Sequence, residues 1–322
     1  MRKDIYIGLD IGGTKILCGI IDDNGKILSR AKRDTPVRST PKKICQVIIE
    51  FLKDAIDDAA VDPRNIKAIG IGVPGIVSHD GNILESPNIP LAGFPFVKAF
   101  QKTFKTRIFV GNDVNLGLLG EKWKGVCRNS KNIISLFLGT GIGGAIVLNG
   151  ELYIGEHGAG AELGHVTLNM NGPKCTCGNK GCLEAHAGRW AIERDIHHAI
   201  RSGKKTVITE SFKGGLKRIK SKMLSKALSK KDRVVTHIIT QAVVALGHGC
   251  ISFNHMFNPE MIVLGGGVME ACGGFILPII RKIVHADPFF KKLPPCKIVE
   301  SQLGDDAVIL GAVAMCKSKG QG

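Results

Sequence analysis

The sequence predicts an α/β protein of two related domains, and three observations carry this prediction. A pattern of apolar strand, glycine-rich loop, apolar strand, turn and strand occurs at residues 4–34 and again at 132–153, as in paired domains. The 322 residues are sufficient for two domains. Segments with the helical spacing of apolar residues follow both patterns, as expected of an α/β fold.

In the first repeat, strands are expected at residues 4–10 and 15–22, which are rich in Ile and Leu. Asp-Asp-Asn-Gly at 22–25 is typical of a hairpin turn into a third strand. A helix is expected at about 41–60, where apolar residues recur at helical spacing, and residues 66–75 are expected to form a buried strand that ends in a loop.

The second half repeats this order. Residues 109–121 contain the end of an apolar strand and the start of a helix, and another helix is expected at about 188–201. Helical patterns dominate 220–257, and a buried strand ends in glycines at 265–268. The Asp-rich segment at 305 begins a last helix, expected to pack on the N-terminal domain. The domains are therefore expected at residues 1–117 with 304–322 and at residues 118–303.

The composition is that of a globular cytoplasmic protein. Hydrophobic residues make up 44% and charged residues 22% of the chain, and no run reaches the ~18–20 apolar residues of a membrane helix. Asp4 and Asp10 interrupt the apolar start, which argues against a signal peptide. Of the ten cysteines, three are clustered and the others scattered, which is typical of a reducing compartment. We therefore expect no membrane partner.

The net charge of +16 is concentrated in residues 201–233, which hold twelve lysine or arginine residues and two acidic residues. We interpret this segment as a solvated helical face, because charge runs usually remain in water. The basic residues do not alternate with aromatic residues that would stack on bases. The sequence therefore predicts no nucleic-acid partner.

Three glycine-rich loops, at residues 12–15, 139–144 and 265–268, each follow an apolar strand. Glycine lets consecutive backbone N–H groups approach an anion, and Thr14 and Thr140 add hydroxyl donors. The Walker A pattern is absent, and a strand follows Gly-Thr-Gly-Ile-Gly-Gly where a dinucleotide-binding loop requires a helix. Two of the loops lie within the repeat, so we predict that these loops bind phosphate groups.

Acidic residues stand at two strand ends. Asp10, beside the first loop, can hold Mg²⁺ directly or through water, or it can cap the turn. Asp113 follows Asn112 at a strand–helix junction, where Asp is often an N-cap. In a phosphoryl transferase, a carboxylate at this place would accept the proton of the attacking hydroxyl. Both pairs of roles remain open at this point.

A cluster of metal-binding residue types is formed by His165, Cys175, Cys177 and Cys182. Four such ligands complete a structural zinc site and leave no open position for a catalytic water. We therefore predict a structural Zn²⁺ ion that fastens this loop; unrelated buried thiols and disulfide pairing are the alternatives.

Two glutamates, Glu162 and Glu184, flank this cluster. Carboxylates held beside an imidazole suit the recognition of adjacent hydroxyls, as on a sugar ring, and structural salt bridges are the alternative reading. Their closeness to the cluster predicts that the metal holds both carboxylates in place.

The motifs together resemble the ROK family, which groups repressors, open-reading-frame proteins and sugar kinases. Asp-Ile-Gly-Gly-Thr-Lys from residue 10 is similar to its first phosphate loop, and Gly-Asn-Asp-Val-Asn from residue 111 to its catalytic segment. The stretch at 138–165 resembles the family signature and Cys-Thr-Cys-Gly-Asn-Lys-Gly-Cys-Leu-Glu its zinc motif. Asn-Pro-Glu-Met-Ile-Val-Leu-Gly-Gly-Gly-Val is similar to its adenosine-side segment. The resemblance covers nearly the whole chain.

The resemblance implies an actin-like, hexokinase-like fold of the ribonuclease H-like class, with two α/β domains around a central cleft. It implies transfer of the γ-phosphate of ATP to the 6-hydroxyl of a hexose with Mg²⁺, glucose being the favoured acceptor. N-acetylhexosamines (GlcNAc or ManNAc) and fructose are alternative acceptors. It also implies homodimers or homotetramers.

By the same resemblance, Asp113 is the base that takes the proton from the sugar hydroxyl. Asn112, Glu162, His165 and Glu184 contact other sugar hydroxyls, so that His165 has one ring nitrogen on zinc and the other toward the sugar. Asn88, in a segment similar to the family's sugar-facing loop, is a further contact. Phosphate and nucleotide contacts fall on Asp10, Gly12, Gly13, Thr14, Lys15, Gly139, Thr140, Gly141, Gly265, Gly266 and Gly267.

An alternative of a different class is a sugar-responsive transcriptional repressor. That branch of the family carries a helix-turn-helix before the kinase-like part, and we expect none here because the first phosphate loop begins at residue 10. The presence of Asp113 also favours catalysis.

Overall fold

The computed structural model describes residues 4–211 and 218–320. The chain divides into two compact units. Unit 1 comprises Met1–Asn129, Leu152–Ala161 and Asp305–Gly322, and unit 2 comprises Ser130–Glu151 and Glu162–Gly304. In the basic segment, Lys213 and Lys217 lie outside the described residues, and the described lysines and arginines from 201 to 233 are all exposed.

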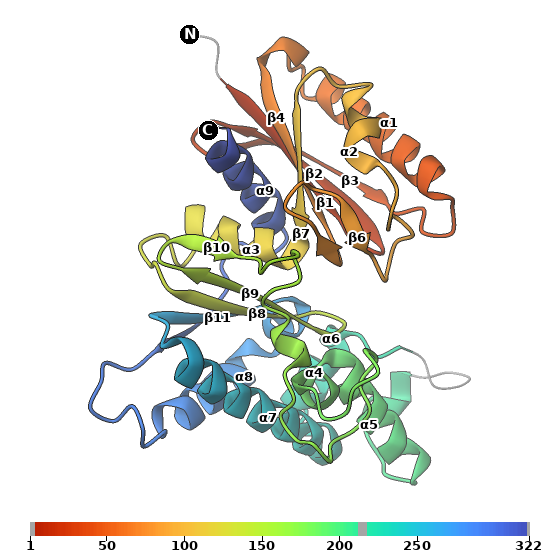
Figure 1. Cartoon of the computed structure of the whole chain (residues 1–322). Helices are drawn as coiled ribbons and strands as arrows, with labels where there is room; N and C mark the ends of the chain where they lie inside the picture. The colour runs from red at the N-terminus through yellow and green to blue at the C-terminus, as the bar shows by residue number, and fades with distance from the viewer. Residues whose placement is uncertain (1–3, 212–217, 321–322) are drawn as a thin grey trace. The chain divides into compact units, whose positions relative to one another are not determined.

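Unit 1 is built on a five-stranded sheet with the order β3-β2-β1-β4-β7 (Figure 1). β1 pairs antiparallel with β2 and parallel with β4, while β2 pairs antiparallel with β3 and β4 parallel with β7. The strands are β1 (Ile5–Ile11), β2 (Lys15–Asp22), β3 (Ile27–Asp34), β4 (Ile66–Val73) and β7 (Arg107–Asn112), with the small hairpin β5 (Ile76–Val77) and β6 (Ile83–Glu85). The helices are α1 (Pro41–Asp58), α2 (Phe96–Gln101), α3 (Asp113–Trp123) and α9 (Asp306–Lys319), with a 3₁₀ turn at Pro63–Asn65.

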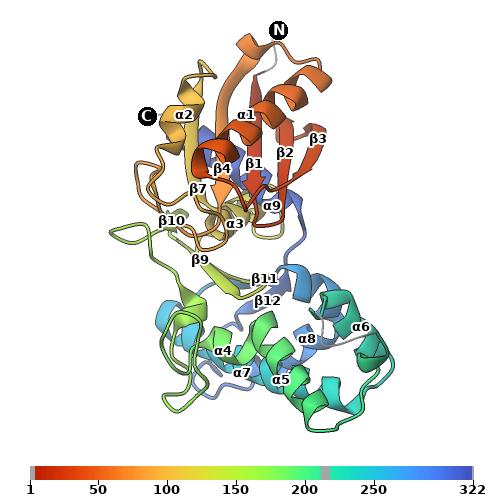
Figure 2. The same ribbon diagram turned by 90° about the vertical axis from the view of Figure 1, so that its right-hand side faces the viewer.

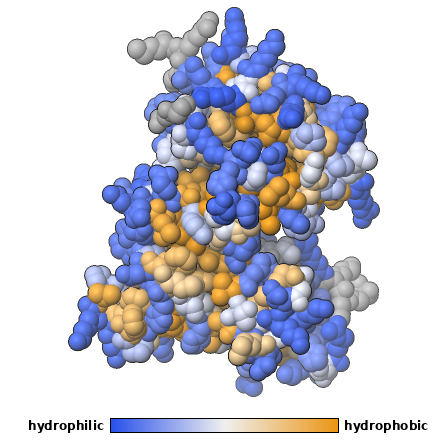
Figure 3. Space-filling view, in the orientation of Figure 1, coloured by the Kyte–Doolittle hydropathy of each residue, from blue (hydrophilic) through white to orange (hydrophobic). Residues whose placement is uncertain are grey.

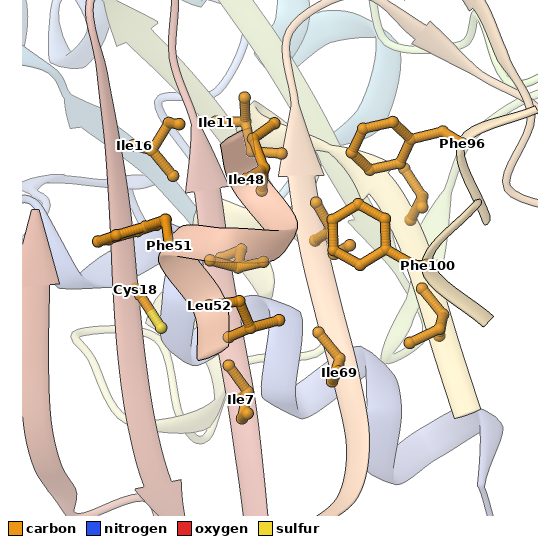
Figure 4. Packing of buried hydrophobic residues seen from close by; sticks show 14 of the residues in the cluster. Ile7, Ile11, Ile16, Cys18, Ile48, Phe51, Leu52, Ile69, Phe96 and Phe100 are labelled. Atoms are coloured by element: carbon orange, nitrogen blue, oxygen red, sulfur yellow. The ribbon is translucent and has the colours of Figure 1, made fainter. Parts of the chain in front are cut away.

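Helix α1 forms at the predicted place because Thr40 and Pro41 define its start. The Thr40 hydroxyl accepts a hydrogen bond from the Lys43 N–H, and Pro41 occupies the first turn, where its missing N–H costs nothing. Its apolar stripe, which includes Ile48 and Leu52, is buried against the alternating inward residues of the sheet (Figure 4). This packing forms the largest part of the core of unit 1.

Helix α9 packs on the opposite face of this sheet (Figures 1 and 2). Gly8 of β1 is paired with Gly19 of β2 and with Gly70 of β4, so three glycines cross the sheet in one row. A Cβ on Gly8 would overlap the carbonyl oxygen of Ile309 in α9. The row therefore lets the helix backbone lie directly against the strands, so that α9 packs on the sheet of the N-terminal segment within unit 1.

Unit 2 repeats this topology, with the sheet order β10-β9-β8-β11-β12. β8 pairs antiparallel with β9 and parallel with β11, which pairs parallel with β12. The internal repeat in the sequence therefore corresponds to two sheets of equivalent connectivity. The strands are β8 (Ile133–Leu138), β9 (Ile142–Leu148), β10 (Glu151–Tyr153), β11 (Met261–Gly265) and β12 (Lys297–Glu300). The helices are α4 (Leu183–Ala187), α5 (Arg189–Arg201), α6 (Ser221–Ser229), α7 (Arg233–Phe257) and α8 (Gly267–His285), with 3₁₀ turns at Leu163–His165 and Thr209–Ser211.

Helix α7 is the central helix of unit 2. Among the described residues it alone is long and apolar enough to cross a membrane by length and composition, and a core helix of a globular protein has the same properties. It packs against α4, α5, α6 and α8.

On the face of the molecule shown in Figure 3, hydrophilic residues cover most of the outline and hydrophobic residues show between them.

Candidate active site

The first glycine loop joins β1 to β2 in unit 1. The Gly12 N–H donates to the Lys15 carbonyl (2.9 Å), and the Thr35 hydroxyl donates to the Gly12 carbonyl (2.6 Å). The side chains of Thr14 and Lys15 are exposed. A Cβ on Gly13 would lie 3.2 Å from the Cβ of the exposed Asn88. The structure thus brings Asn88 against the loop and leaves the polar side chains of the loop accessible.

Asp10 and Asp113 lie near each other in unit 1. Asp10 is the penultimate residue of β1, and its side chain is half-buried. Burial, together with the negative charges of Asp113 and Asp305, raises the pKa of Asp10 to about 7. Such a carboxyl group gains most from a nearby cation, because a cation offsets both the lost water and the neighbouring charges.

Asn112 and Asp113 have different roles at the junction between β7 and α3. Asn112, not Asp113, is the N-cap of α3: its side-chain oxygen accepts from the Asn115 N–H (2.9 Å). The Asn112 amide nitrogen donates to the Gly75 carbonyl (2.9 Å). Asp113 is the first residue of the helix and accepts from the Val114 N–H (2.9 Å). Its carboxylate therefore lies at the N-terminal, positive end of the helix dipole.

The second glycine loop joins β8 to β9 in unit 2 and is held from one side by helix α5. Arg189 donates from Nη2 to the Thr140 hydroxyl (3.0 Å) and from Nε to the Gly139 carbonyl (3.4 Å). The Trp190 N–H donates to the Thr140 carbonyl (3.1 Å). Within residues 4–211 and 218–320, nothing lies within 4 Å of a Cβ placed on Gly139, so these residues leave this part of the loop open to a ligand.

Glu184 supports the same loop from helix α4. Its side chain is buried, and Oε2 accepts from the Ile142 N–H (2.8 Å). Oε1 accepts from the Trp190 ring N–H (3.0 Å) and from the Thr176 hydroxyl (3.4 Å). A Cβ on Gly141 would overlap this carboxylate, so glycine at this position lets the carboxylate lie directly against the loop backbone. Both oxygens of this predicted sugar contact therefore already have protein donors.

The predicted metal ligands converge. One ligand atom from each of His165, Cys175, Cys177 and Cys182 lies within 4.8 Å of the others. The Cys177 and Cys182 sulfurs are 3.7 Å apart, as are the Cys175 sulfur and His165 Nδ1. Zn–S bonds of about 2.3 Å in a tetrahedral site place two thiolates about 3.8 Å apart, so the group fits Zn²⁺. The backbone N–H of Asn179 lowers the pKa of the Cys177 thiol, which favours the thiolate.

Glu162 precedes the short turn that carries His165. The surrounding protein raises the pKa of Glu162 by displacing water, the His165 charge lowers it, and the Glu184 charge raises it. These three predicted sugar contacts therefore lie close enough to affect one another's charge. A carboxylate pair beside an imidazole can accept and donate several hydrogen bonds at once.

The third glycine loop ends β11 and begins α8. Gly266 is the N-cap of α8 and has a φ of 85°, which favours glycine. A Cβ on Gly266 would lie 2.7 Å from the Leu138 carbonyl, so this loop is next to the second one. Of the described residues, Ser221 alone comes within 4 Å of a Cβ on Gly267, with its hydroxyl at 3.8 Å.

Sequence reasoning missed three residues of this site. Thr176, Arg189 and Trp190 fix the second glycine loop or the carboxylate beside it. The available signal was position, because Thr176 stands between two metal ligands and the other two residues follow the zinc motif by a few residues. Spacing alone did not indicate which loop they would contact.

Comparisons with known proteins place this site in a family. The chain is 35% identical over 322 residues to the glucokinase of Thermotoga maritima, covering 99% of each chain. It is 28% identical to the xylose repressor of Caldicellulosiruptor bescii, covering 98% of this chain and 79% of that protein. The crystal structure of a ROK family glucokinase from Streptomyces griseus, in complex with glucose and AMPPNP, is similar with a TM-score of 0.82. It is 28% identical, and the alignment covers 98% of this chain and 99% of that one.

The fold and the sequence agree in these comparisons. The likeness to the ROK kinase structure confirms the expected actin-like α/β fold. A profile of the ROK family matches residues 6–319, which is nearly the whole described chain. The chain therefore belongs to the ROK family.

Proposed function

We propose that this chain is an ATP-dependent hexokinase that transfers the γ-phosphate of ATP to the 6-hydroxyl of a hexose, with glucose as the preferred acceptor. The observation that carries the proposal is that Asn112 and Asp113 have different roles at the start of α3. Asn112 supplies the cap, so the carboxylate of Asp113 is not required for capping and can serve as the base. The likeness to two glucokinases supports this assignment.

In this mechanism Asp113 accepts the proton of the sugar hydroxyl as that oxygen attacks the γ-phosphorus of ATP. The backbone N–H groups of residues 12–15 and 139–141 bind the phosphate oxygens, on which negative charge is spread during transfer. Mg²⁺, when bound, would neutralise part of this charge, and Asp10 is the residue to hold it. Catalysis then consists mostly of positioning and electrostatic stabilisation.

We assign the sugar contacts to Asn88, Asn112, Glu162, His165 and Glu184. His165 directs Nδ1 toward the cysteine cluster, so Nε2 is the atom to meet a sugar hydroxyl. The Asn112 oxygen and Glu184 Oε2 each accept one protein hydrogen bond, so each has a further lone pair for a hydroxyl donor, whereas Glu184 Oε1 already accepts two. N-acetylhexosamines and fructose are the alternative acceptors.

We further propose that the cysteine cluster holds a structural Zn²⁺ ion. Three thiolates and one imidazole fill a tetrahedral shell, so the ion would take no part in the transfer. Its contribution would be to fix the turn of His165 beside Glu162 and Glu184.

A sugar-responsive repressor is the second candidate, because a xylose repressor is among the relatives. This candidate requires sugar binding without turnover. The glycine loops and the placement of Asp113 favour the kinase, since a repressor needs no base at this position.

A sugar panel tests the proposal. The protein is incubated with Mg·ATP and one of six sugars: glucose, mannose, fructose, GlcNAc, ManNAc or xylose. ADP release gives the rate, and phosphorus NMR identifies the phosphorylated product. We expect glucose 6-phosphate with the highest kcat/KM for glucose. Turnover on GlcNAc or ManNAc alone would show that an N-acetylhexosamine is the acceptor. Sugar binding without turnover, together with retention on DNA at moderate salt, would show that the protein is a repressor and not a kinase.

A further inference from the structure

We infer that the cysteine cluster positions the second glycine loop through the carboxylate of Glu184, so that metal occupancy and nucleotide binding are coupled. The inference rests on the proposed function, because it takes this loop as a phosphate site and the cluster as a metal site. It assigns to Glu184 a positioning role toward the donor in addition to its sugar contact.

The connection begins between two metal ligands. Thr176 lies between Cys175 and Cys177, and its hydroxyl donates to Glu184 Oε1 (3.4 Å). Glu184 itself is two residues from the ligand Cys182, on the helix that begins there. The position of this carboxylate is therefore set from both ends of the cysteine loop.

The connection ends on the glycine loop. Glu184 Oε2 accepts from the backbone N–H of Ile142 (2.8 Å) and touches the space where a side chain on Gly141 would be. A Cβ on Gly188, at the end of the same helix, would lie 3.5 Å from the Gly141 Cα. A shift of α4 would therefore move Gly141 and Ile142, and with them the direction of the N–H groups that would face phosphate.

Trp190 strengthens this connection. Its ring packs against the buried Cys175, Cys182 and Ala185, and its ring N–H donates to Glu184 Oε1. Its backbone N–H donates to the Thr140 carbonyl (3.1 Å). One residue thus contacts two metal ligands, the bridging carboxylate and the phosphate loop. Because coupling between two binding sites is reciprocal, bound nucleotide should also strengthen metal retention.

Calorimetric titration with Mg·AMPPNP tests the inference on three forms of the protein. These are the zinc-loaded protein, the protein stripped with a chelator, and the stripped protein after return of Zn²⁺. We expect the Kd for AMPPNP to rise about tenfold on stripping and to recover with Zn²⁺, as is typical of coupled sites. In a Trp123→Phe background, which leaves Trp190 as the single tryptophan, emission should change on stripping and on adding AMPPNP.

The Glu184→Gln variant tests whether Glu184 connects the cysteine cluster to the second glycine loop, even if the zinc-stripped protein unfolds. Glutamine keeps one acceptor for the Ile142 N–H but turns an NH₂ donor toward the Trp190 ring N–H, so it breaks one of the two connections. We expect full zinc content and about a tenfold weaker Kd for AMPPNP. Glu260→Gln is the matched control, because Glu260 also accepts backbone N–H groups, from Lys131 and Asn132, at another loop of unit 2.

The outcomes separate the two proposals. An AMPPNP Kd that is unchanged in zinc-loaded Glu184→Gln, or equally weakened in Glu260→Gln, overturns the coupling and leaves the hexokinase proposal intact. Zinc-loaded wild-type protein that does not bind AMPPNP at all overturns the proposed function, and the inference with it.

Discussion

At the scale of single residues, Asp113 and Asp10 are two neighbouring carboxyl groups with different tasks. Asp113 lies at the positive end of the dipole of a helix whose cap is supplied by Asn112. Asp10 is held among negative charges and protein atoms, and its pKa is raised to about 7. Pairs of carboxyl groups that differ in this way are typical of sites that separate proton transfer from cation binding.

The role of Asp113 as base predicts the effect of Asp113→Asn. Asparagine keeps the size and the hydrogen bond to the Val114 N–H but cannot accept the sugar proton, so kcat should fall by about 10²–10⁴-fold. The Kd for the sugar, measured by calorimetry, should change little. Asp54→Asn, which removes an exposed partner of Arg33, is the control; near-normal kcat in Asp113→Asn would show that the base is another group.

The raised pKa of Asp10 predicts how stability depends on pH. The folded protein binds this proton more tightly than the unfolded chain, whose Asp pKa is about 4. The folded state therefore loses stability as pH rises from about 4 to about 7, by at most about 4 kcal/mol in total. Solvent access to the half-buried side chain reduces this figure.

Asp10→Asn should remove this dependence, because asparagine has no proton to lose. In Mg²⁺-free buffer, the Tm of Asp10→Asn minus that of the wild type should increase between pH 4 and pH 7 and then level off. Differential scanning calorimetry at several pH values measures it. A difference that is constant from pH 4 to pH 8 would mean that Asp10 titrates in the ordinary range.

At the scale of elements, the glycines that cross the first sheet decide how α9 packs. The row of Gly8, Gly19 and Gly70 brings α9 against the strands, and Gly311 of α9 lies against the Leu116 carbonyl of α3 in the same way. Contact at this distance tolerates no side chain. The close packing of α9 in unit 1 thus requires glycine at these positions.

Gly8→Ala should therefore destabilise the protein by about 1–3 kcal/mol, because its methyl group would overlap the Ile309 carbonyl. Gly274→Ala is the matched control: it lies within α8 with open space around it, and alanine there should raise helix stability by up to about 1 kcal/mol. Thermal unfolding should therefore give a lower Tm for Gly8→Ala than for the wild type and an equal or higher Tm for Gly274→Ala. Equal Tm values would contradict the close packing of α9.

At the scale of the whole molecule, the repeat gives two units that carry different parts of the proposed chemistry. Unit 1 holds Asp10, the first glycine loop and Asp113, and unit 2 holds the second and third glycine loops with the cysteine cluster. The cluster lies entirely within unit 2, so loss of the proposed Zn²⁺ should disturb that unit alone.

Hydrogen exchange followed by mass spectrometry tests this confinement with Cys177→Ser. The exposed Cys177 is replaced by a weaker ligand with little change in volume. Peptides around 139–142 and 162–190 should exchange faster, because metal binding no longer orders them. Peptides from β1 and α9 serve as the internal control, and an equal increase in both units would show that the metal supports the whole fold.

The sequence determined the elements and the kinds of chemistry, because both are written in local patterns. Apolar spacing located α1 and the first strands, the repeat predicted two equivalent sheets, and the cysteine spacing brought four ligands together. The segment of α8 escaped prediction, since Gly273, Gly274 and Pro278 lower its helical signal.

Only the tertiary structure decided the partners of those groups. It gave the cap of α3 to Asn112, directed both oxygens of Glu184 to protein donors, and brought Arg189 onto the second glycine loop. The cap is local, but Glu184 meets Ile142 across 42 positions and Arg189 meets Thr140 across 49 positions. Local sequence fixes which groups can donate or accept a hydrogen bond, whereas the packing of helices on sheets fixes which of them meet.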